Sequence, residues 1–244
     1  MKIGCVKYLN ARPLIDGWPD SVDFDVPSTL CRKLARGDLD VALVSSIEYL
    51  RRPHYRIVDG VSISAFGPVY SVIVAHREEL SRITQIEVDP ASATSIALVR
   101  CLLAARQLNV RLSQKQGDAQ MLIGDQAIRF RQTHPGYRFW DLAEEWTNIT
   151  GLSFVFALWL VRPEVPNASK IADRLRTLRD ENLRCLDELI SAGNSLDAEF
   201  CGRYFRENLC FDFGEREKAG LCEFHRHCVA CGIDVTQEIE LDLV

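Results

Sequence analysis

Three hydroxyl side chains stand at the expected start of a long helix. Ser92, Thr94 and Ser95 open a segment in which apolar residues recur at helical spacing from Ile96 to Leu103. A helix start offers unpaired backbone N–H groups and the positive end of the helix dipole, so these residues could bind a carboxylate. The alternative is that Ser92 or Thr94 serves only as the cap of its helix.

A second polar group follows the first expected strand. Lys2–Val6 has the composition of a strand, and Asn10 and Arg12 come after it, just before Pro13. Arg12 could bind a carboxylate through two parallel hydrogen bonds. Asn10 could contact a ligand or cap a helix that begins near Pro13.

The order of strands and helices selects the loops in which a ligand would bind. Helices are expected between or after strands at Val22–Val26, Val41–Val44, Val69–Ala75, Ile86–Val88, Met121–Ile123 and Phe154–Val161. This order predicts a parallel sheet in the first stretch, with helices on its faces. Ligands of open α/β sheets bind beyond the carboxyl ends of strands and at helix N-termini. The rule selects the loops Tyr8–Asn10, Ser45–Ser46, Ser62–Ser71, Ser92–Ser95 and Thr150–Gly151.

Two α/β units followed by helices predict a two-lobed α/β binding fold. We expect the first part of lobe one at residues 1–75, lobe two at 76–158, and the return to lobe one with the C-terminal helices at 159–244. The chain would cross between lobes near Val74–His76 and Val155–Trp159. The C-terminal helices would be separated around Gly193–Asn194 and Phe211–Gly214.

Composition and charge narrow the class of function. The 244 residues carry a net charge of −5 and no basic stripe, so nucleic acid is not an expected partner. No apolar run reaches the roughly 18 residues that cross a bilayer, and the N-terminus lacks the apolar region of a secretory signal. We therefore expect a cytoplasmic protein that binds no membrane and whose nine cysteines, an odd number, are reduced. The sequence leaves open whether the chain forms a homodimer.

The spacing of five residues near the C-terminus is similar to that of zinc ligands: Cys222, His225, His227, Cys228 and Cys231. The segment Leu221–Val229 nevertheless has the pattern of a helix, on which His225 and His227 lie on different faces. We therefore expect no metal here, and no glycine-rich loop points to a nucleotide cofactor. Cys222 and Val229 should be buried, and substituting His227 should change stability by no more than about 0.5 kcal/mol.

Five sequence blocks occur in order through the first two thirds of the chain. They are Tyr8-Leu9-Asn10-Ala11-Arg12-Pro13-Leu14, Gly37–Ala42 followed by Ser45–Tyr49, Gly67-Pro68-Val69-Tyr70-Ser71, Leu122–Asp125, and Glu145–Trp146 with Thr150–Leu152 and Phe154–Ala157. Together they resemble the menaquinone-biosynthesis chorismate dehydratase family. The opening block favours this family over the related dihydroxynaphthoate synthases, which share its fold.

This resemblance implies a type II periplasmic-binding-protein-like fold, with mixed sheets flanked by helices and a helical C-terminal segment. It also implies that chorismate loses water to give 3-[(1-carboxyvinyl)oxy]benzoate, the entry to the futalosine route to menaquinone. Asn10 and Ser71 would be the catalytic polar contacts. The substrate would be bound by Arg12, Ser45, Ser46, Ser92, Thr94, Ser95, Thr150 and Gly151.

The reaction removes the C3 proton and the C4 hydroxyl of chorismate, and the selected loops contain no evident general base. The five histidines lie outside the matched blocks. One hypothesis is that the enolpyruvyl carboxylate of the substrate itself takes the proton, while Asn10 and Ser71 hold the ring and the hydroxyl.

Three positions depart from the family pattern and put the identity of the substrate in question. The family usually has an acidic residue in place of Phe66, an arginine in place of Ala93 and a proline in place of Ser153. The main alternative is therefore a non-catalytic cytosolic protein that binds an aromatic or small carboxylate. The effector domain of a regulator is a third interpretation, although we find no helix-turn-helix segment.

Overall fold

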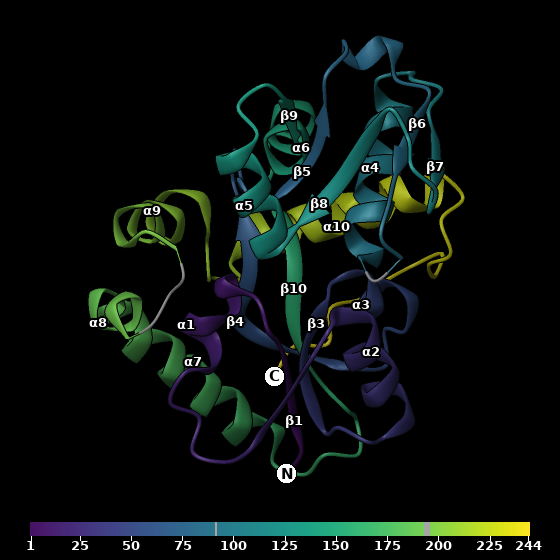
Figure 1. The fold of residues 1–244 in the computed structure, drawn as a ribbon. Coiled ribbons are helices and arrows are strands. Elements are labelled where there is room, and N and C mark those ends of the chain that lie inside the picture. The colour runs from purple at the N-terminus through teal and green to yellow at the C-terminus, as the bar shows by residue number, and fades with distance from the viewer. Residues whose placement is uncertain (91, 193–195) are drawn as a thin grey trace.

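Short apolar runs form the strands of two five-stranded sheets in the computed structural model, which describes residues 1–90, 92–192 and 196–244. The first sheet has the order β2-β1-β3-β10-β4, with strands Val22–Asp25, Ile3–Val6, Val41–Ser45, Phe154–Val161 and Arg56–Ala65. The second has the order β7-β6-β8-β5-β9, with strands Arg111–Ser113, Gln85–Glu87, Ala119–Ile123, Val72–His76 and Arg138–Asp141. The first sheet lies in the lower lobe of Figure 1 and the second in the upper lobe.

Both sheets are mixed. β1 pairs parallel with β2 and β3, whereas β10 pairs antiparallel with β3 and β4. In the second sheet β6 pairs parallel with β7 and β8, and β5 pairs antiparallel with β8 and β9. The predicted mixed α/β class is confirmed, as is parallel pairing among the first strands.

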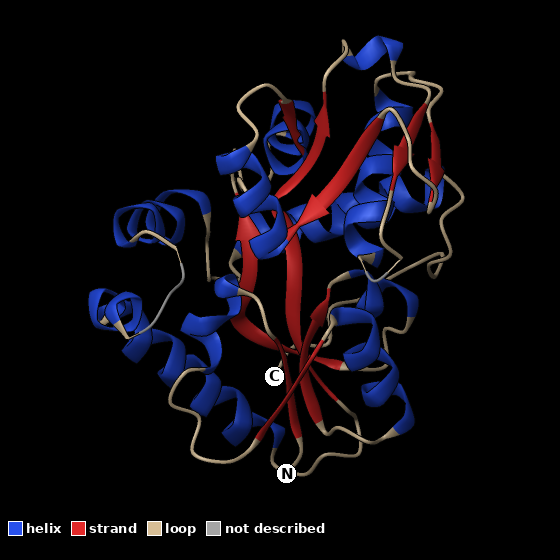
Figure 2. Ribbon diagram, viewed as in Figure 1, coloured by secondary structure: helices blue, strands red, loops and turns tan. Residues whose placement is uncertain are grey.

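Helices cover the faces of both sheets (Figure 2). The lower lobe carries η1 Leu9–Ala11, α1 Arg12–Ile15, α2 Pro27–Arg36, α3 Ile47–Arg51, α7 Ala168–Arg184, α8 Leu186–Ser191, α9 Ala198–Arg203 and the π-helical turn η3 Tyr204–Asn208. The upper lobe carries η2 Leu80–Arg82, α4 Ala93–Ala105, α5 Gly124–Thr133 and α6 Leu142–Thr150. The last helix, α10 Glu215–Ala230, packs against both β10 and α4 and so joins the lobes. None of the helices in the described ranges has the length and apolar character that crossing a membrane requires.

The chain changes sheet twice. It leaves the first sheet after β4, which ends at Ala65, and enters the second at Val72; it returns after α6, when β10 begins at Phe154. We propose lobe boundaries within residues 66–71 and 151–153, a few residues before the divisions expected at 75–76 and 158–159. Gly151 at the second crossing has a φ of 70°, a conformation that suits glycine and ends α6.

Strand β4 was not predicted, because its serines read as a polar loop. In the structure Ser62 and Ser64 are buried and donate hydrogen bonds to the carbonyl oxygens of Asp212 (2.5 Å) and Cys210 (3.2 Å). A distant part of the chain therefore satisfies these hydroxyls. The short strands β7 and β9 were also missed. The expected break at Phe211–Gly214 precedes α10 as predicted, whereas Gly193–Asn194 lies outside the described residues.

Helix α10 buries a different stripe from the one expected. Leu221, Phe224 and Cys228 are buried, whereas Cys222 is exposed and Val229 is half-buried. The prediction for Cys222 and Val229 is wrong. Helical periodicity fixes the spacing of the buried residues, whereas packing against the neighbouring elements decides which face of the helix is buried.

The rotation of α10 is set where it crosses the start of β10. A Cβ atom at Gly220 would lie 2.0 Å from the carbonyl oxygen of Ser153, so only glycine allows this approach. The rotation also brings the ring of His227 edge-on to Trp146, with 5.3 Å between centroids. In the described part of the chain, no three His, Cys, Asp or Glu side chains are arranged to hold a metal ion.

Candidate functional site

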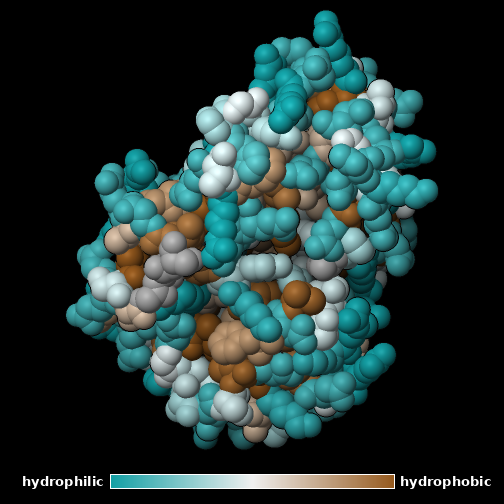
Figure 3. Space-filling model, viewed as in Figure 1, coloured by the Kyte–Doolittle hydropathy of each residue, from teal (hydrophilic) through white to brown (hydrophobic). Residues whose placement is uncertain are grey.

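A pocket lies where strands of the two sheets end. The space between its walls, counting the open mouth, is about 570 Å³. Its apolar walls come from both lobes: Val6, Pro27, Ile63, Val69, Val72, Ile123, Phe156 and Ala157. In the space-filling view, hydrophobic residues show in the middle of a face whose periphery is mostly hydrophilic (Figure 3).

Six of the ten predicted site residues line this pocket: Asn10, Ser45, Ser71, Ser92, Thr94 and Ser95. They come from η1, which follows β1, from the end of β3, from the residue before β5 and from the start of α4. Tyr8 and Gly124 complete the polar part of the lining. The structure therefore brings together loops that the strand-end rule selected separately.

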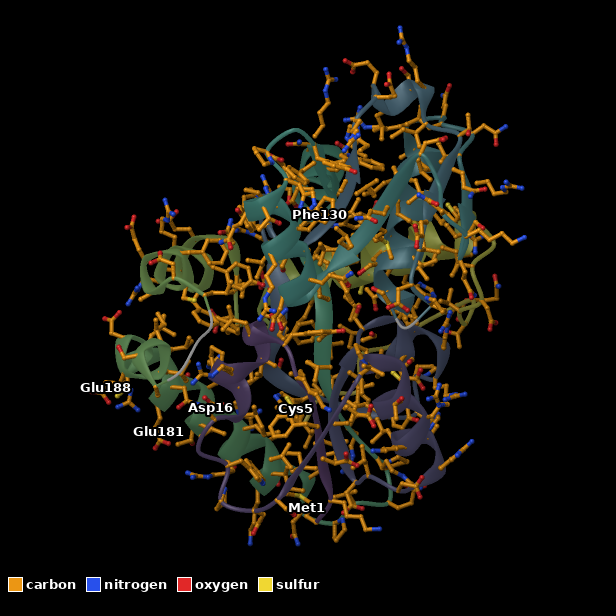
Figure 4. The ribbon with its side chains drawn as sticks, in the orientation of Figure 1. Met1, Cys5, Asp16, Phe130, Glu181 and Glu188 are labelled. Carbon is orange, nitrogen blue, oxygen red and sulfur yellow. The ribbon has the colours of Figure 1, made fainter. Side chains whose placement is uncertain are left out.

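Arg12 and Ser46 are not part of the pocket lining. The guanidinium of Arg12 pairs with the carboxylate of Asp16 at 2.8 Å, and Asp16 lies on the side of the lobe near α7 (Figure 4). The hydroxyl of Ser46 is fully buried and donates to the carbonyl oxygen of Val155 at 2.7 Å. In the structure both side chains have partners within the protein.

Thr150 and Gly151 also lie outside the lining, at the end of α6. The Thr150 hydroxyl donates to the carbonyl oxygen of Trp146 at 2.8 Å and accepts from the backbone N–H of Leu152. Gly151 provides the left-handed cap of the helix. These residues end α6 and precede the return strand β10, and their contact with a ligand stays a prediction.

Asn10 does not cap a helix. The residues at the cap positions of η1 and α1 are Tyr8 and Ala11, and neither helix receives a hydrogen bond from the Asn10 side chain. The carboxamide oxygen of Asn10 is buried and has no hydrogen-bond partner among the described residues. A buried acceptor without a donor costs about 1–3 kcal/mol, so the site favours a ligand that donates a hydrogen bond here.

The start of α4 offers two unengaged hydroxyls. Ser92 stands at the cap position, yet its side chain makes no capping hydrogen bond. Thr94 accepts from the backbone N–H of Ile47, at the start of α3, at 3.3 Å. Within the described ranges, the hydroxyls of Ser92 and Ser95 have no hydrogen-bond partner, so they and the helix start can meet an anionic ligand.

Another wall of the pocket is formed where the segment Tyr8–Leu9 meets the start of α5. The backbone N–H of Leu9 donates to the carboxylate of Asp125 at 3.0 Å. Gly124 has a φ of 57°, and a Cβ atom there would lie 2.9 Å from the Tyr8 ring. The Leu9–Asp125 and Ile47–Thr94 bonds each connect an element of the lower lobe with a helix of the upper lobe.

The loop that carries Ser71 is held by Asp141, at the end of β9. The carboxylate of Asp141 accepts from the backbone N–H groups of Val69 (3.1 Å) and Tyr70 (2.7 Å), and it also caps α6. Burial raises the pKa of Asp141, while these hydrogen bonds and the nearby Arg131 oppose the shift. The guanidinium of Arg131 lies over the Tyr70 ring at 4.2 Å.

Tyr204 reaches the same loop from the C-terminal helical segment. Its hydroxyl lies 2.7 Å from the hydroxyl oxygen of Ser71, and both side chains are buried. Sequence reasoning missed Tyr204, because it stands 133 residues from Ser71 in a stretch whose only evident pattern was helical. We find no signal in the sequence that could have identified this contact.

Solved structures show the same architecture. A protein from Archaeoglobus fulgidus superposes with a TM-score of 0.70 at 18% identity, covering 95% of this chain and 97% of that chain. The periplasmic aliphatic sulphonate binding protein of Escherichia coli superposes with a TM-score of 0.65 at 15% identity, covering 98% and 96%. The expected periplasmic-binding-protein-like fold is confirmed.

Sequence relatives point to one family. A chorismate dehydratase of Thermus thermophilus is 30% identical over 223 residues, which cover 78% of this chain and 80% of that protein. A chorismate dehydratase of Campylobacter jejuni is 28% identical over 228 residues, which cover 93% and 92%. Residues 1–230 match a family model described as menaquinone biosynthesis. The chain therefore belongs to the menaquinone biosynthesis family.

Proposed function

We propose that this protein is a chorismate dehydratase, a hydro-lyase that converts chorismate into 3-[(1-carboxyvinyl)oxy]benzoate. The observation that carries the proposal is that one pocket brings together Asn10, Ser71 and the hydroxyl-rich start of α4. These are the residues that the family resemblance assigns to catalysis and to substrate binding. The names of the two relatives support the same activity.

The chemistry makes modest demands on the protein. The C3–H bond breaks, its electron pair forms the new ring double bond, and the C4–O bond breaks; the proton and the hydroxyl group leave as one water molecule. Because the ring becomes aromatic, the reaction is strongly favourable. The protein mainly has to orient the substrate and assist the departure of the hydroxyl group.

The composition of the pocket lining favours a mechanism in which a group of the substrate itself accepts the C3 proton. Among the described residues that line it, Tyr8 has the only titratable side chain. Burial raises the pKa of Tyr8, and the nearby Asp89 and Asp125 add to the shift, so this phenol keeps its proton. The enolpyruvyl carboxylate of chorismate would then accept the C3 proton, as we expected from the sequence.

The remaining polar groups fit a substrate with two carboxylates and a hydroxyl. Ser92 and Ser95 would donate to one carboxylate at the start of α4. The unpaired carboxamide oxygen of Asn10 would accept from a donor such as the substrate hydroxyl. Ser71 would donate to the hydroxyl group as it leaves.

The test is incubation of the purified protein with chorismate. The diene absorbance should decay and the benzoate product should appear by mass spectrometry, and dialysis against a chelator should leave the rate unchanged. The double variant Asn10→Ala/Ser71→Ala serves as the control for contaminating enzymes. Saturable binding of chorismate without any turnover would instead show the non-catalytic binding protein, and absence of both would reject the proposed substrate.

A further inference from the structure

We infer that Tyr204 is a positioning residue whose buried hydroxyl donates to Ser71 and thereby directs the Ser71 proton into the pocket, toward the departing hydroxyl group. This inference rests on the proposed function, since it gives Ser71 a task in the loss of water. It concerns a residue that lies outside the five sequence blocks and outside the pocket lining.

The surroundings of Tyr204 leave its hydroxyl one partner. The side chain is 1% exposed, and its ring stacks on Phe200 with 5.8 Å between centroids and 12° between planes. Phe205 packs against it at the same centroid distance. In the described part of the chain, the hydroxyl of Ser71 is the only hydrogen-bond partner of the Tyr204 hydroxyl.

The direction of this hydrogen bond follows from what each group would lose. If Ser71 donated, the phenolic proton of Tyr204 would be buried without an acceptor, which costs about 1–3 kcal/mol. If Tyr204 donates, the proton of Ser71 is free, and Ser71 borders a pocket in which a ligand can accept it. Burial raises the pKa of Tyr204, so the phenol keeps the proton that it donates.

This arrangement fixes where the Ser71 proton can point. A serine hydroxyl has one proton and two lone pairs, and Tyr204 occupies one of the lone pairs. Because Ser71 lines the pocket, a ligand there can accept its proton, so Ser71 would meet the substrate as a donor. The donated bond also polarises the Ser71 hydroxyl, which strengthens the bond that Ser71 makes in turn. Neither residue gains or loses a proton overall, and no bond to either one breaks.

The turn that begins at Tyr204 holds the same loop a second time, through the side chain of Asn208. Tyr204 is the first residue of the π-helical turn that ends at Asn208, and such turns occur frequently at functional sites. The side-chain amide of Asn208 donates to the carbonyl oxygen of Pro68 at 2.8 Å. One turn of the C-terminal segment therefore contacts both the side chain of Ser71 and the backbone three residues before it.

The test begins with chorismate turnover by the wild-type protein, which decides the proposed function by itself. Tyr204→Phe should then lower kcat roughly tenfold while KM stays within about twofold, because the lost contact acts on the leaving group. The affinity for 3-[(1-carboxyvinyl)oxy]benzoate, which lacks the C4 hydroxyl, should not change, and this binding also verifies the fold. Tyr49→Phe is the matched control, because the buried hydroxyl of Tyr49 donates to the backbone carbonyl oxygen of Glu240 (2.6 Å) outside the pocket.

A double-mutant cycle separates positioning from general stabilisation. In the Ser71→Ala background, Tyr204→Phe should have almost no further effect on kcat, since the hydroxyl that it orients is gone. Equal losses in both backgrounds would overturn the inference, as would a wild-type kcat for Tyr204→Phe. In either case the activity of the wild-type protein would leave the proposed function standing.

Discussion

The carboxylate of Asp141 accepts a 2.7 Å hydrogen bond from the backbone N–H of Tyr70, whose φ of 66° lies in the left-handed region. A bulky residue rarely adopts this conformation without external support. The support comes from Asp141 on the backbone and from Arg131 over the ring. Tyr70 directly precedes Ser71. The contact between Asp141 and Tyr70 therefore fixes the backbone from which the Ser71 side chain projects.

Asp141→Ala should destabilise the protein by about 3 kcal/mol, because it leaves buried N–H groups of the loop and of α6 without an acceptor. Turnover of chorismate should fall roughly 10- to 100-fold as Ser71 shifts. Urea unfolding and steady-state kinetics measure the two effects. Asp197→Ala is the control, since Asp197 caps α9 by accepting from the backbone N–H of Phe200. This substitution should cost about 1 kcal/mol without loss of activity. Equal behaviour of the two variants would contradict the role given to Asp141.

Gly124→Ala should damage the pocket. The added methyl group would lie 2.9 Å from the Tyr8 ring, and the φ of 57° disfavours alanine as well. We expect a loss of about 1–3 kcal/mol and weaker binding of chorismate, measured by calorimetry. Gly136→Ala has open space around its Cβ position and should stay within about 0.5 kcal/mol of the wild type. An unchanged affinity of Gly124→Ala for chorismate would contradict the interpretation that Tyr8 forms a wall of the substrate pocket.

Ser153, at a position where the family resemblance led us to expect proline, has a hydrogen-bond partner in the structure. Its buried hydroxyl donates to the carboxylate of Glu217 at 2.8 Å, and the same carboxylate accepts from the N–H of Gly214. Ser153→Ala should therefore cost about 1–3 kcal/mol in urea unfolding and leave kcat unchanged. Ser191→Ala, which removes an exposed hydroxyl bonded within its own helix, should cost about 0.5 kcal/mol or less. A fall in kcat for Ser153→Ala would place this residue closer to the chemistry than its position indicates.

The raised pKa of Tyr204 predicts a specific dependence of stability on pH. In the unfolded chain this tyrosine ionises near pH 10, whereas in the folded protein it keeps its proton to higher pH. Its contribution to stability is therefore complete below about pH 10 and is lost above it, by up to about 1.4 kcal/mol per pH unit. The difference in unfolding free energy between the wild type and Tyr204→Phe should be constant from about pH 7 to 9 and shrink above about pH 10. A difference that stays constant through about pH 11 would mean that the folded and unfolded pKa values are alike.

The parts of the site that were predictable are those with a local signature. Asn10 follows the first strand and Ser71 directly precedes β5, and the order of strands and helices was sufficient to select both loops. The ion pair of Arg12 was also predictable, because Asp16 follows it four residues later, at the spacing of an ion pair along a helix.

The parts that were not predictable depend on contacts between distant segments. Ser62 and Ser64 look like loop residues until the carbonyl groups of Asp212 and Cys210 lie beside them. The rotation of α10 depends on the approach of Gly220 to Ser153, which no period in the sequence encodes. The hydrogen bond between Tyr204 and Ser71 likewise joins distant segments of the chain.

The two hydrogen bonds between the lobes have a kinetic consequence. Any wider opening of the pocket separates Leu9 from Asp125 and Ile47 from Thr94 at the same time. If a ligand enters through such an opening, breaking the two bonds costs about 0.5–1.5 kcal/mol each, so the open form would be a minority of molecules. Association would then be slower than free diffusion allows, and the product would leave through the same opening.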